Sequence, residues 1–260
     1  MRNILLAALL FVSCILFITV GQIYWQKKID QSIQHAMTEE KGSAQTVDNE
    51  DEVMKYAANL PPEVQKKVKN AIHKNKPVRL VIVGSKAISS SKKSWPALLT
   101  NKLEAAYGKR VFQVVVKEYG EMTTKEALEA KVDQEIIKAK PDILLWEPFI
   151  LNNNGMVAID ETLKDIETMI ESITSALPDV TIILQPPNPI YNARYYPAQV
   201  EEFKTFAAEN GYLYLDHWKA WPDYKSDELN NHVDRQTGLP NENGHRLWAD
   251  FLINYFIAKQ

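Results

Sequence analysis

The chain has very little of several residue types that support common chemistries. A single cysteine, Cys14, among 260 residues excludes an intrachain disulfide and a cysteine-based zinc cluster. Only nine glycines are present, and Gly84 stands alone rather than in the glycine-rich pattern of a nucleotide-binding loop. No His, Asp and Glu group has metal-ligand spacing. We therefore expect no metal and no cofactor.

The charge balance also excludes a class of partner. The chain carries 30 Lys and Arg against 33 Asp and Glu, a formal net charge of -3. Without an overall basic field, nothing holds a phosphate backbone, so we expect no nucleic-acid partner. The 45% of hydrophobic and 24% of charged residues are typical of one ordinary globular domain and exclude a disordered or collagen-like chain.

The one long apolar run lies at the N-terminus. Residues Ile4 to Val20 carry no charge and would span roughly 25 Å as a helix. Adding the residues up to Trp25 brings the segment to bilayer thickness, and Lys27 and Lys28 follow it at the interface. The pattern predicts a transmembrane anchor over residues 1–25, with Cys14 buried in the membrane.

The alternative to an anchor is a cleaved signal peptide, which would leave a secreted protein. No small-residue cleavage motif follows Val20, and Phe11-Val12-Ser13 before Cys14 is a poor lipoprotein signal. A short N-terminal tail before a long domain favours a globular part outside the cytoplasm. Residues 26–76 are predicted to form a stalk and a leading helix, and residues 77–260 the folded domain.

The folded domain alternates strand and helix patterns. Continuous apolar runs predict five strands, and helical periodicity predicts helices between them. The expected strands are Val78 to Gly84, Val111 to Val116, Ile143 to Trp146, Val180 to Leu184 and Tyr212 to Leu215. The expected helices are Pro61 to Lys76, Trp95 to Ala106, Lys125 to Ala139, Ile159 to Ala176, Ala198 to Asn210 and Asn243 to Ala258. This order predicts a three-layer α/β/α sandwich with a five-stranded parallel sheet.

Ligands of such sheets bind at the carboxyl ends of the strands. Small and polar residues follow every predicted strand at that edge. They are Gly84-Ser85-Lys86, Tyr119-Gly120-Glu121, Glu147-Pro148 with Asn152, Gln185-Pro186-Pro187-Asn188 and Asp216-His217-Trp218. We expect the functional site among these five loops, with Trp218 as an aromatic platform and Glu147 as either a buried acid or a ligand contact.

Four sequence blocks in these loops resemble the SGNH, or GDSL, hydrolase family. The blocks are VIVGSKAISSSKKSWPALL, EYGEMTTKEAL, PDILLWEPFILNNNG and PNENGHRLWADFL. The resemblance covers about Val78 to Phe256 and implies a flavodoxin-like sandwich that cleaves or transfers acyl groups. It assigns the oxyanion hole to Gly120 and to Asn152, with Asn153 as the alternate, and matches Pro240, Asn241, Gly244 and His245 in the last block.

The same comparison shows four departures from the family pattern, three of them at the catalytic triad. Ungapped, Ser85 falls at the family's aspartate, Lys86 at its nucleophile, Gln236 at its catalytic aspartate and Leu239 at its histidine. An acyl transfer needs a nucleophile beside a base, and leucine accepts no proton. All three triad positions are therefore changed.

Other residues of the chain could replace the missing groups. Ser85 could be the nucleophile one position early, with Lys86 as its base. His245 could reach the site by another loop path, or His217 could approach from the fifth strand, oriented by Asp216 or Asp234. The sequence leaves these alternatives open.

Two functions remain as hypotheses. The first is an SGNH-type hydrolase or acyl transferase acting on ester bonds, such as the O-acetyl groups of a glycan, at the cell envelope. The second is a catalytically inactive protein of the same fold that binds a glycan or a partner protein.

Overall fold

The computed structural model describes residues 50–259, which belong to one compact unit spanning Glu50–Gln260. The predicted anchor over residues 1–25 and most of the predicted stalk lie outside the described residues. Within residues 50–259, no helix is both long enough and apolar enough to cross a bilayer.

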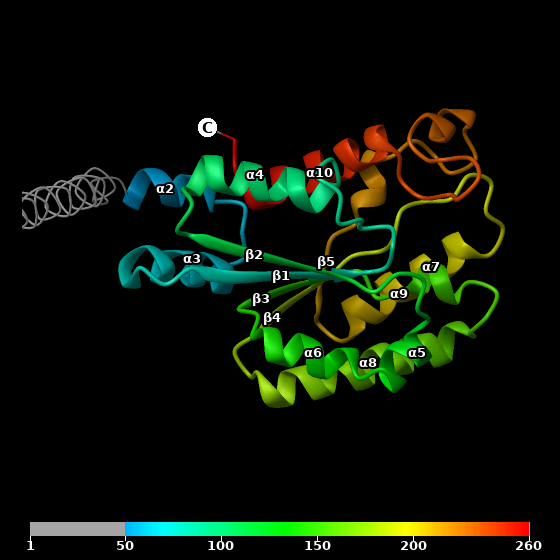
Figure 1. Ribbon diagram of the computed structural model, residues 1–260, viewed down its shortest axis with the longest axis horizontal. Helices are drawn as coiled ribbons and strands as arrows, with labels where there is room; N and C mark the ends of the chain where they lie inside the picture. The colour runs from blue at the N-terminus through cyan, green and yellow to red at the C-terminus, as the bar shows by residue number, and fades with distance from the viewer. Residues whose placement is uncertain (1–49, 260) are drawn as a thin grey trace, which may run out of the picture. The chain divides into compact units, whose positions relative to one another are not determined.

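Five parallel strands form one sheet in the order β2-β1-β3-β4-β5 (Figure 1). The strands are β1 (Val78–Gly84), β2 (Phe112–Glu118), β3 (Ile143–Trp146), β4 (Thr181–Leu184) and β5 (Leu213–Tyr214). This is the doubly wound, flavodoxin-like order, so the predicted three-layer sandwich is confirmed. The strand order reverses between β1 and β3, and the loops after these two strands flank the crevice where such sheets bind ligands.

Helices cover both faces of the sheet. On one side lie α2 (Glu50–Tyr56), α3 (Pro62–Lys74), α4 (Trp95–Tyr107) and α10 (Glu242–Phe256). On the other lie α5 (Thr124–Glu129), α6 (Val132–Ala139), α8 (Ile159–Ala176) and α9 (Tyr196–Glu209). Short elements complete the chain at the strand ends: α7 (Ile150–Asn153) and the 3₁₀ helices η1 (His217–Ala220) and η2 (Asp227–Asn231).

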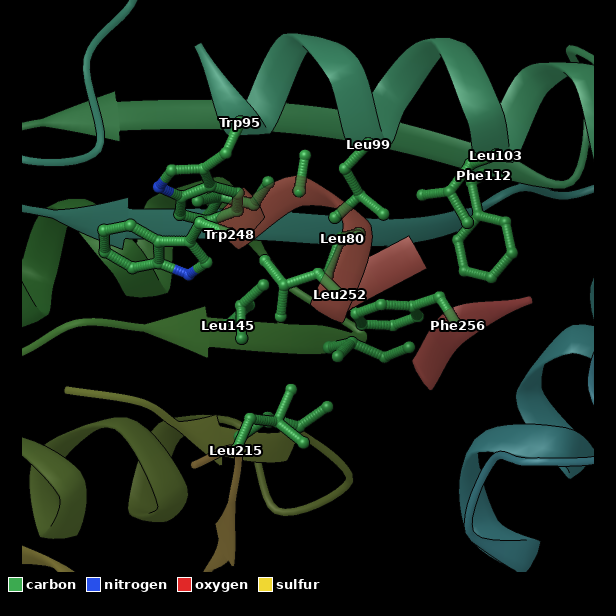
Figure 2. Packing of buried hydrophobic residues seen from close by; sticks show 14 of the residues in the cluster. Leu80, Trp95, Leu99, Leu103, Phe112, Leu145, Leu215, Trp248, Leu252 and Phe256 are labelled. Carbon is green, nitrogen blue, oxygen red and sulfur yellow. The ribbon is translucent and has the colours of Figure 1, made fainter. Parts of the chain in front are cut away.

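Alternation along the strands explains the two cores. Leu80 and Ile82 of β1 point to the α4 and α10 side, and Val81 and Val83 point to the α8 side. Figure 2 shows the first core, where Trp95 of α4 and Trp248 of α10 stack with ring centroids 5.1 Å apart. This core fixes the start of α10 against the end of β1, the region in which the candidate site lies.

The domain begins earlier than the predicted boundary at residue 77. Leu60, Val64 and Val68 are buried in the first core, and the Ala258 N–H donates to the Tyr56 carbonyl at 2.8 Å. The leading helix is therefore part of the folded domain rather than of a stalk, because its apolar face covers the sheet.

The start of α10 has its own local structure. The Asn241 side chain caps the helix by accepting hydrogen bonds from the Asn243 and Gly244 N–H groups at 2.9 and 3.2 Å. A Cβ on Gly244 would lie 2.1 Å from the His232 carbonyl oxygen and 2.9 Å from the Trp221 ring. Only glycine lets the loop before α10 approach the helix this closely.

Candidate functional site

A buried carboxylate lies at the carboxyl end of β3, where the strand order reverses. Glu147 follows β3 directly and is fully buried. Its Oε2 accepts hydrogen bonds from the Ser85 N–H at 2.8 Å and the Ser85 hydroxyl at 2.7 Å, and its Oε1 accepts one from the Phe149 N–H at 3.1 Å. A Cβ on Gly84 would lie 2.8 Å from Oε2. Glu147 therefore ties the loop after β1 to the end of β3, and Gly84 makes room for it.

Burial controls the ionisation of Glu147. Desolvation raises the pKa of this carboxyl to about 7 from 4.5, although the hydrogen bonds from Ser85 and Phe149 oppose the shift. Of the two readings of Glu147 from sequence, the structure shows the buried, hydrogen-bonded acid.

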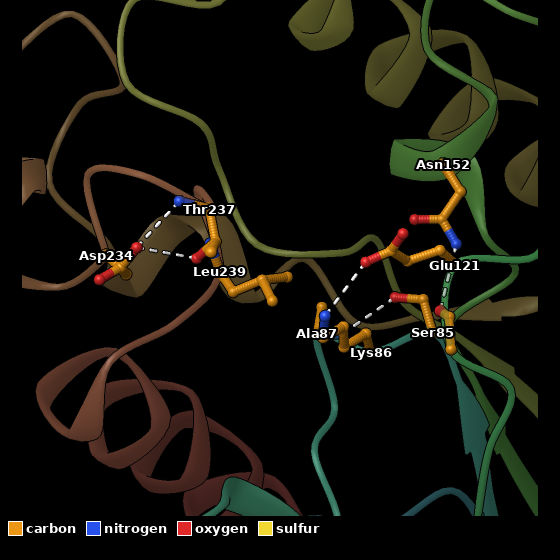
Figure 3. Close-up of polar contacts among 9 residues, drawn as sticks. Ser85, Lys86, Ala87, Glu121, Asn152, Asp234, Thr237 and Leu239 are labelled. Atoms are coloured by element: carbon orange, nitrogen blue, oxygen red, sulfur yellow. Dashed lines mark hydrogen bonds and ion pairs between the residues drawn. The ribbon is translucent and has the colours of Figure 1, made fainter.

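Ser85 is turned inward at the same place. It is 1% exposed, and its hydroxyl donates to Glu147. Figure 3 shows its other hydrogen bond, in which Oγ accepts from the Ala87 N–H at 3.2 Å. Among the described residues, no histidine nitrogen hydrogen-bonds to Ser85. The hydroxyl thus fixes the loop and is directed away from solvent.

Lys86, at the family's nucleophile position, points to solvent instead. Its side chain is 52% exposed, and its Nζ lies 3.1 Å from Glu121 Oε1. Its backbone N–H donates to the Gly120 carbonyl at 2.7 Å. The loops after β1 and β2 are therefore joined twice at this residue.

A surface pocket of about 410 Å³ opens beside Lys86. Its lining combines a lysine, three serines, a carboxylate, an apolar pair and a histidine. The lining residues are Lys86, Ser89, Ser90, Ser91, Glu118, Leu239, Pro240 and His245. Figure 3 shows Leu239 on the loop that faces Lys86 and Ala87. The positions that the resemblance assigns to nucleophile and base thus meet in one pocket, as Lys86 and Leu239. We name it the Lys86 pocket.

His245 is the histidine of this pocket. It is 8% exposed, and its Nδ1 has no hydrogen-bond partner among the described residues. Desolvation lowers its pKa to about 4, so the imidazole is neutral at pH 7. The residue lines the pocket, while its unpaired Nδ1 is itself buried.

His217 is held in a different environment. Its Nε2 lies 2.8 Å from the Pro186 carbonyl and its Nδ1 accepts a hydrogen bond from Trp221 Nε1 at 2.9 Å, so Nε2 carries the proton. The ring stacks on Trp248 at 4.1 Å, and burial lowers its pKa to about 3. Both nitrogens are occupied, and the geometry gives His217 no proton to exchange with Ser85. Trp218 is likewise anchored, its Nε1 donating to the Pro187 carbonyl at 2.7 Å.

Asp234 lies in an exposed turn. Its Oδ1 accepts hydrogen bonds from the Gln236 N–H, the Thr237 N–H and the Thr237 hydroxyl, and these bonds lower its pKa. Within the described part of the chain it hydrogen-bonds to no histidine. The structure therefore does not bring Ser85, His217 and Asp234 together as a relay.

The residues that the resemblance assigns to the oxyanion hole lie in the expected loops, but the side-chain amide of Asn152 is already hydrogen-bonded within the protein. Asn152 Nδ2 donates to the Met122 carbonyl at 2.8 Å, and Gly120 adopts a positive φ of 64° in the same loop. The alternate, Asn153, is buried and hydrogen-bonds to Thr124 and Thr162. Asn152 thus lies at the crevice, with its amide engaged by the loop after β2.

Sequence reasoning missed Glu118 and the serines at 89–91 as pocket residues. The polar run ISSSKK between the first strand and Trp95 was the available signal. Among residues 50–259, no cluster of three or more His, Cys, Asp and Glu side chains could hold a metal ion.

Comparison with solved structures places the fold. A protein described as lipolytic, of the G-D-S-L family, from Desulfitobacterium hafniense DCB-2 matches with a TM-score of 0.57 and 18% identity, over 68% of this chain and 99% of that one. An acetylxylan esterase from Geobacillus stearothermophilus matches with a TM-score of 0.58 and 15% identity, over 71% and 96%. An α/β hydrolase from the metagenome of Lake Arreo gives 0.57 and 16%, over 70% and 95%.

These likenesses define the class: the chain has the fold of the GDSL, or SGNH, hydrolases. The resemblance expected from the sequence is confirmed at the level of the fold. No family model matches the chain, and no curated protein matches it either.

Proposed function

We propose that this protein is an SGNH-fold binding protein that recognises an acylated glycan in the Lys86 pocket. The observation that carries the proposal is that Lys86 and Leu239 line one pocket at the positions where an ester hydrolase of this fold needs a serine and a histidine. A leucine side chain cannot take a proton from a nucleophile. The serine next to Lys86 in the chain is Ser85, and its buried hydroxyl donates its hydrogen bond to Glu147.

The lining of the pocket suits a neutral, oxygen-rich ligand. Lys86 and the serines at 89–91 offer donors to acyl carbonyls and hydroxyls, and Glu118 offers an acceptor. Leu239 and Pro240 supply an apolar surface for an acyl methyl group. An acylated glycan is also the ligand class suggested by analogy with the acetylxylan esterases of the same fold.

Ester hydrolysis is the second candidate, and His245 is the observation that favours it. The imidazole of His245, neutral at pH 7, belongs to a residue that lines the pocket and could accept a proton there from an attacking water or hydroxyl. In this alternative the base is His245, six positions after residue 239, where the resemblance expects the family's histidine.

One experiment separates the two candidates. The full chain is incubated with acetylated xylan, and released acetate is measured beside Ser85→Ala and His245→Gln variants. We expect saturable binding of acetylated xylan, no acetate release above background, and no labelling by a fluorophosphonate serine reagent. Acetate release that disappears in either variant would establish the hydrolase.

A restored variant provides the positive control. Ser85→Asp, Lys86→Ser, Gln236→Asp and Leu239→His together return the family's residues to the positions given by the resemblance. Since the fold places 86 and 239 at one pocket, we expect this variant to gain fluorophosphonate labelling that the wild type lacks.

The location is part of the proposal. We place the domain outside the cytoplasm, held at the membrane by residues 1–25; the uncharged apolar run from Ile4 to Val20 supports the anchor. A glycan ligand at the cell envelope is consistent with this location.

A further inference from the structure

A second cavity lies along α10, away from the residues of the Lys86 pocket. Its volume is about 830 Å³, within the usual range of ligand sites. We call it the α10 groove. It is lined by Asn59, Ala220, His232, Asn243, Arg246, Leu247, Asp250, Phe251, Asn254 and Tyr255. No residue lines both this groove and the Lys86 pocket.

The floor of the groove consists of two parallel rows on α10. Residues four apart lie above one another on a helix, so each row forms a continuous stripe. The polar row is Arg246, Asp250 and Asn254, which are exposed, and the apolar row is Leu247, Phe251 and Tyr255, which are half-buried. The groove thus presents an aromatic strip beside a hydrogen-bonding strip.

The walls of the groove come from distant parts of the chain. Asn59, in the turn between α2 and α3, donates from Nδ2 to the Asn254 carbonyl at 2.8 Å. At the other end, Asn243 Nδ2 donates to the Asn231 carbonyl at 3.1 Å. Both walls are therefore tied to α10 by hydrogen bonds, and the groove is formed before any ligand binds.

Several polar groups of the groove are unused. Within residues 50–259, Arg246 and Asp250 form no hydrogen bond or ion pair, although they lie four apart on one face. The Nδ1 atom of His232 is buried, and it too has no hydrogen-bond partner among the described residues. Cationic, anionic and amide groups thus face one cavity, beside two aromatic rings.

We propose that the α10 groove binds a neutral oligosaccharide. A sugar ring offers hydroxyls that both donate and accept, which matches paired Arg, Asp and Asn side chains, and an apolar face that packs on aromatic rings. A hydrocarbon ligand would remove water from Arg246 and Asp250 and would offer no hydrogen bonds in place of those that the two side chains make to water. The two opposite charges also cancel, so the groove gives no net attraction for an anionic or cationic ligand. This inference is independent of whether the Lys86 pocket binds or hydrolyses an ester.

The test measures binding of three probes without ester-linked acetyl groups to the full chain by calorimetry. The probes are neutral β-1,4-linked tetrasaccharides of N-acetylglucosamine, glucose and xylose. We expect at least one to bind with a dissociation constant of about 1 mM or tighter. The double variant Arg246→Ala, Asp250→Ala should weaken that binding by at least about tenfold, since it removes two charge-assisted sets of hydrogen bonds.

A matched pair on the opposite face of the sheet is the control. Asp160→Ala with Lys164→Ala removes an exposed acid and base, also four apart, from α8. This control should bind as the wild type does. If the double variant on α10 fails to fold, the isosteric Asp250→Asn variant replaces it and should also weaken binding. Absence of binding by all three probes, equal binding by wild type and groove variants, or equal loss in the α8 control would each overturn the proposal.

Discussion

Glu147 shows how a single buried carboxylate sets the chemistry of the crevice. It accepts three hydrogen bonds, two of them from Ser85, and yet burial still raises its pKa to about 7. Desolvation outweighs the hydrogen bonds, so the carboxyl takes up a proton more readily in the folded protein than in the unfolded chain. The hydrogen bonds that hold the loop after β1 are therefore made to a carboxyl group that titrates near neutral pH.

This shift predicts a pH dependence of stability. Between pH 4.5 and about 7, the folded protein holds a proton on Glu147 that the unfolded chain has released, so stability falls as pH rises through this window. The contribution is about 3 kcal/mol. Measured by urea unfolding of the 50–260 fragment, the wild type should lose about this much stability relative to Glu147→Gln between pH 4.5 and 7.5.

The comparison with Glu147→Gln is needed because two histidines act in the opposite direction. The pKa values of His217 and His245 are lowered to about 3 and about 4, so their contribution is present above pH 6.5 and is lost as pH falls. Both histidines are present in wild type and variant and cancel in the difference. Parallel pH profiles for the two proteins would refute a titrating Glu147.

At this scale the sequence predicted positions but not partners. Ser85, Lys86, Glu147 and Asn152 were all expected at the strand ends, and they are found there. The hydrogen bond between Ser85 and Glu147 joins residues 62 apart in the chain. The inward orientation of the serine hydroxyl depends on this distant contact, which no local sequence pattern predicts. For the same reason the sequence left both His217 and His245 open as candidates, although the structure surrounds them differently.

Among the elements, α3 packs in the first core although much of its sequence is charged. Six of its thirteen residues are charged or histidine, but Val64, Val68 and Ala71 form a buried stripe on the sheet. Its periodicity predicted a helix, and the helix is present. Only tertiary contact shows that it belongs to the domain.

Removing α2 and α3 should therefore destabilise the domain. Leu60, Val64 and Val68 are almost fully buried, and burial of each such side chain contributes about 1.5 to 3 kcal/mol. Their sum is comparable with the whole net stability of a typical domain. We expect the 50–260 fragment to unfold cooperatively in a thermal melt monitored by circular dichroism, and a 77–260 fragment to lack a cooperative transition. Equal melting midpoints would show that the predicted boundary at residue 77 was right.

The five strands were predicted within about two residues at each end, because buried parallel strands are continuous apolar runs. The predicted helix from Lys125 to Ala139 is wrong in one respect: it is two helices, α5 and α6, separated at Lys131. Lys131 adopts a left-handed conformation with φ of 57°, which is uncommon for lysine. Neither glycine nor proline marks the break, so no local signal could have located it.

For the molecule as a whole, the proposed location of the domain outside the cytoplasm can be measured directly. Cys14 is the only cysteine and falls in the predicted anchor, so a second cysteine can report the location of the domain. Lys92 is exposed on the loop between β1 and α4. In intact cells, we expect Lys92→Cys to react with a membrane-impermeant maleimide and the wild type to remain unlabelled. Labelling of the variant only after lysis would place the domain in the cytoplasm.

The start of α10 has a consequence for how proteins of this fold are recognised from sequence. Two of the four residues that match the last family block have structural roles here, Asn241 as the helix cap and Gly244 in close packing, whereas the position that would carry the family's histidine, 239, is leucine. Steric necessity preserves the first two whether or not an ester is ever cleaved. A search for Pro-Asn-x-x-Gly-His therefore detects the capping and packing at the start of the last helix. If our proposal is right, such a search groups binding proteins with enzymes unless the position two before the asparagine, 239 in this chain, is scored separately.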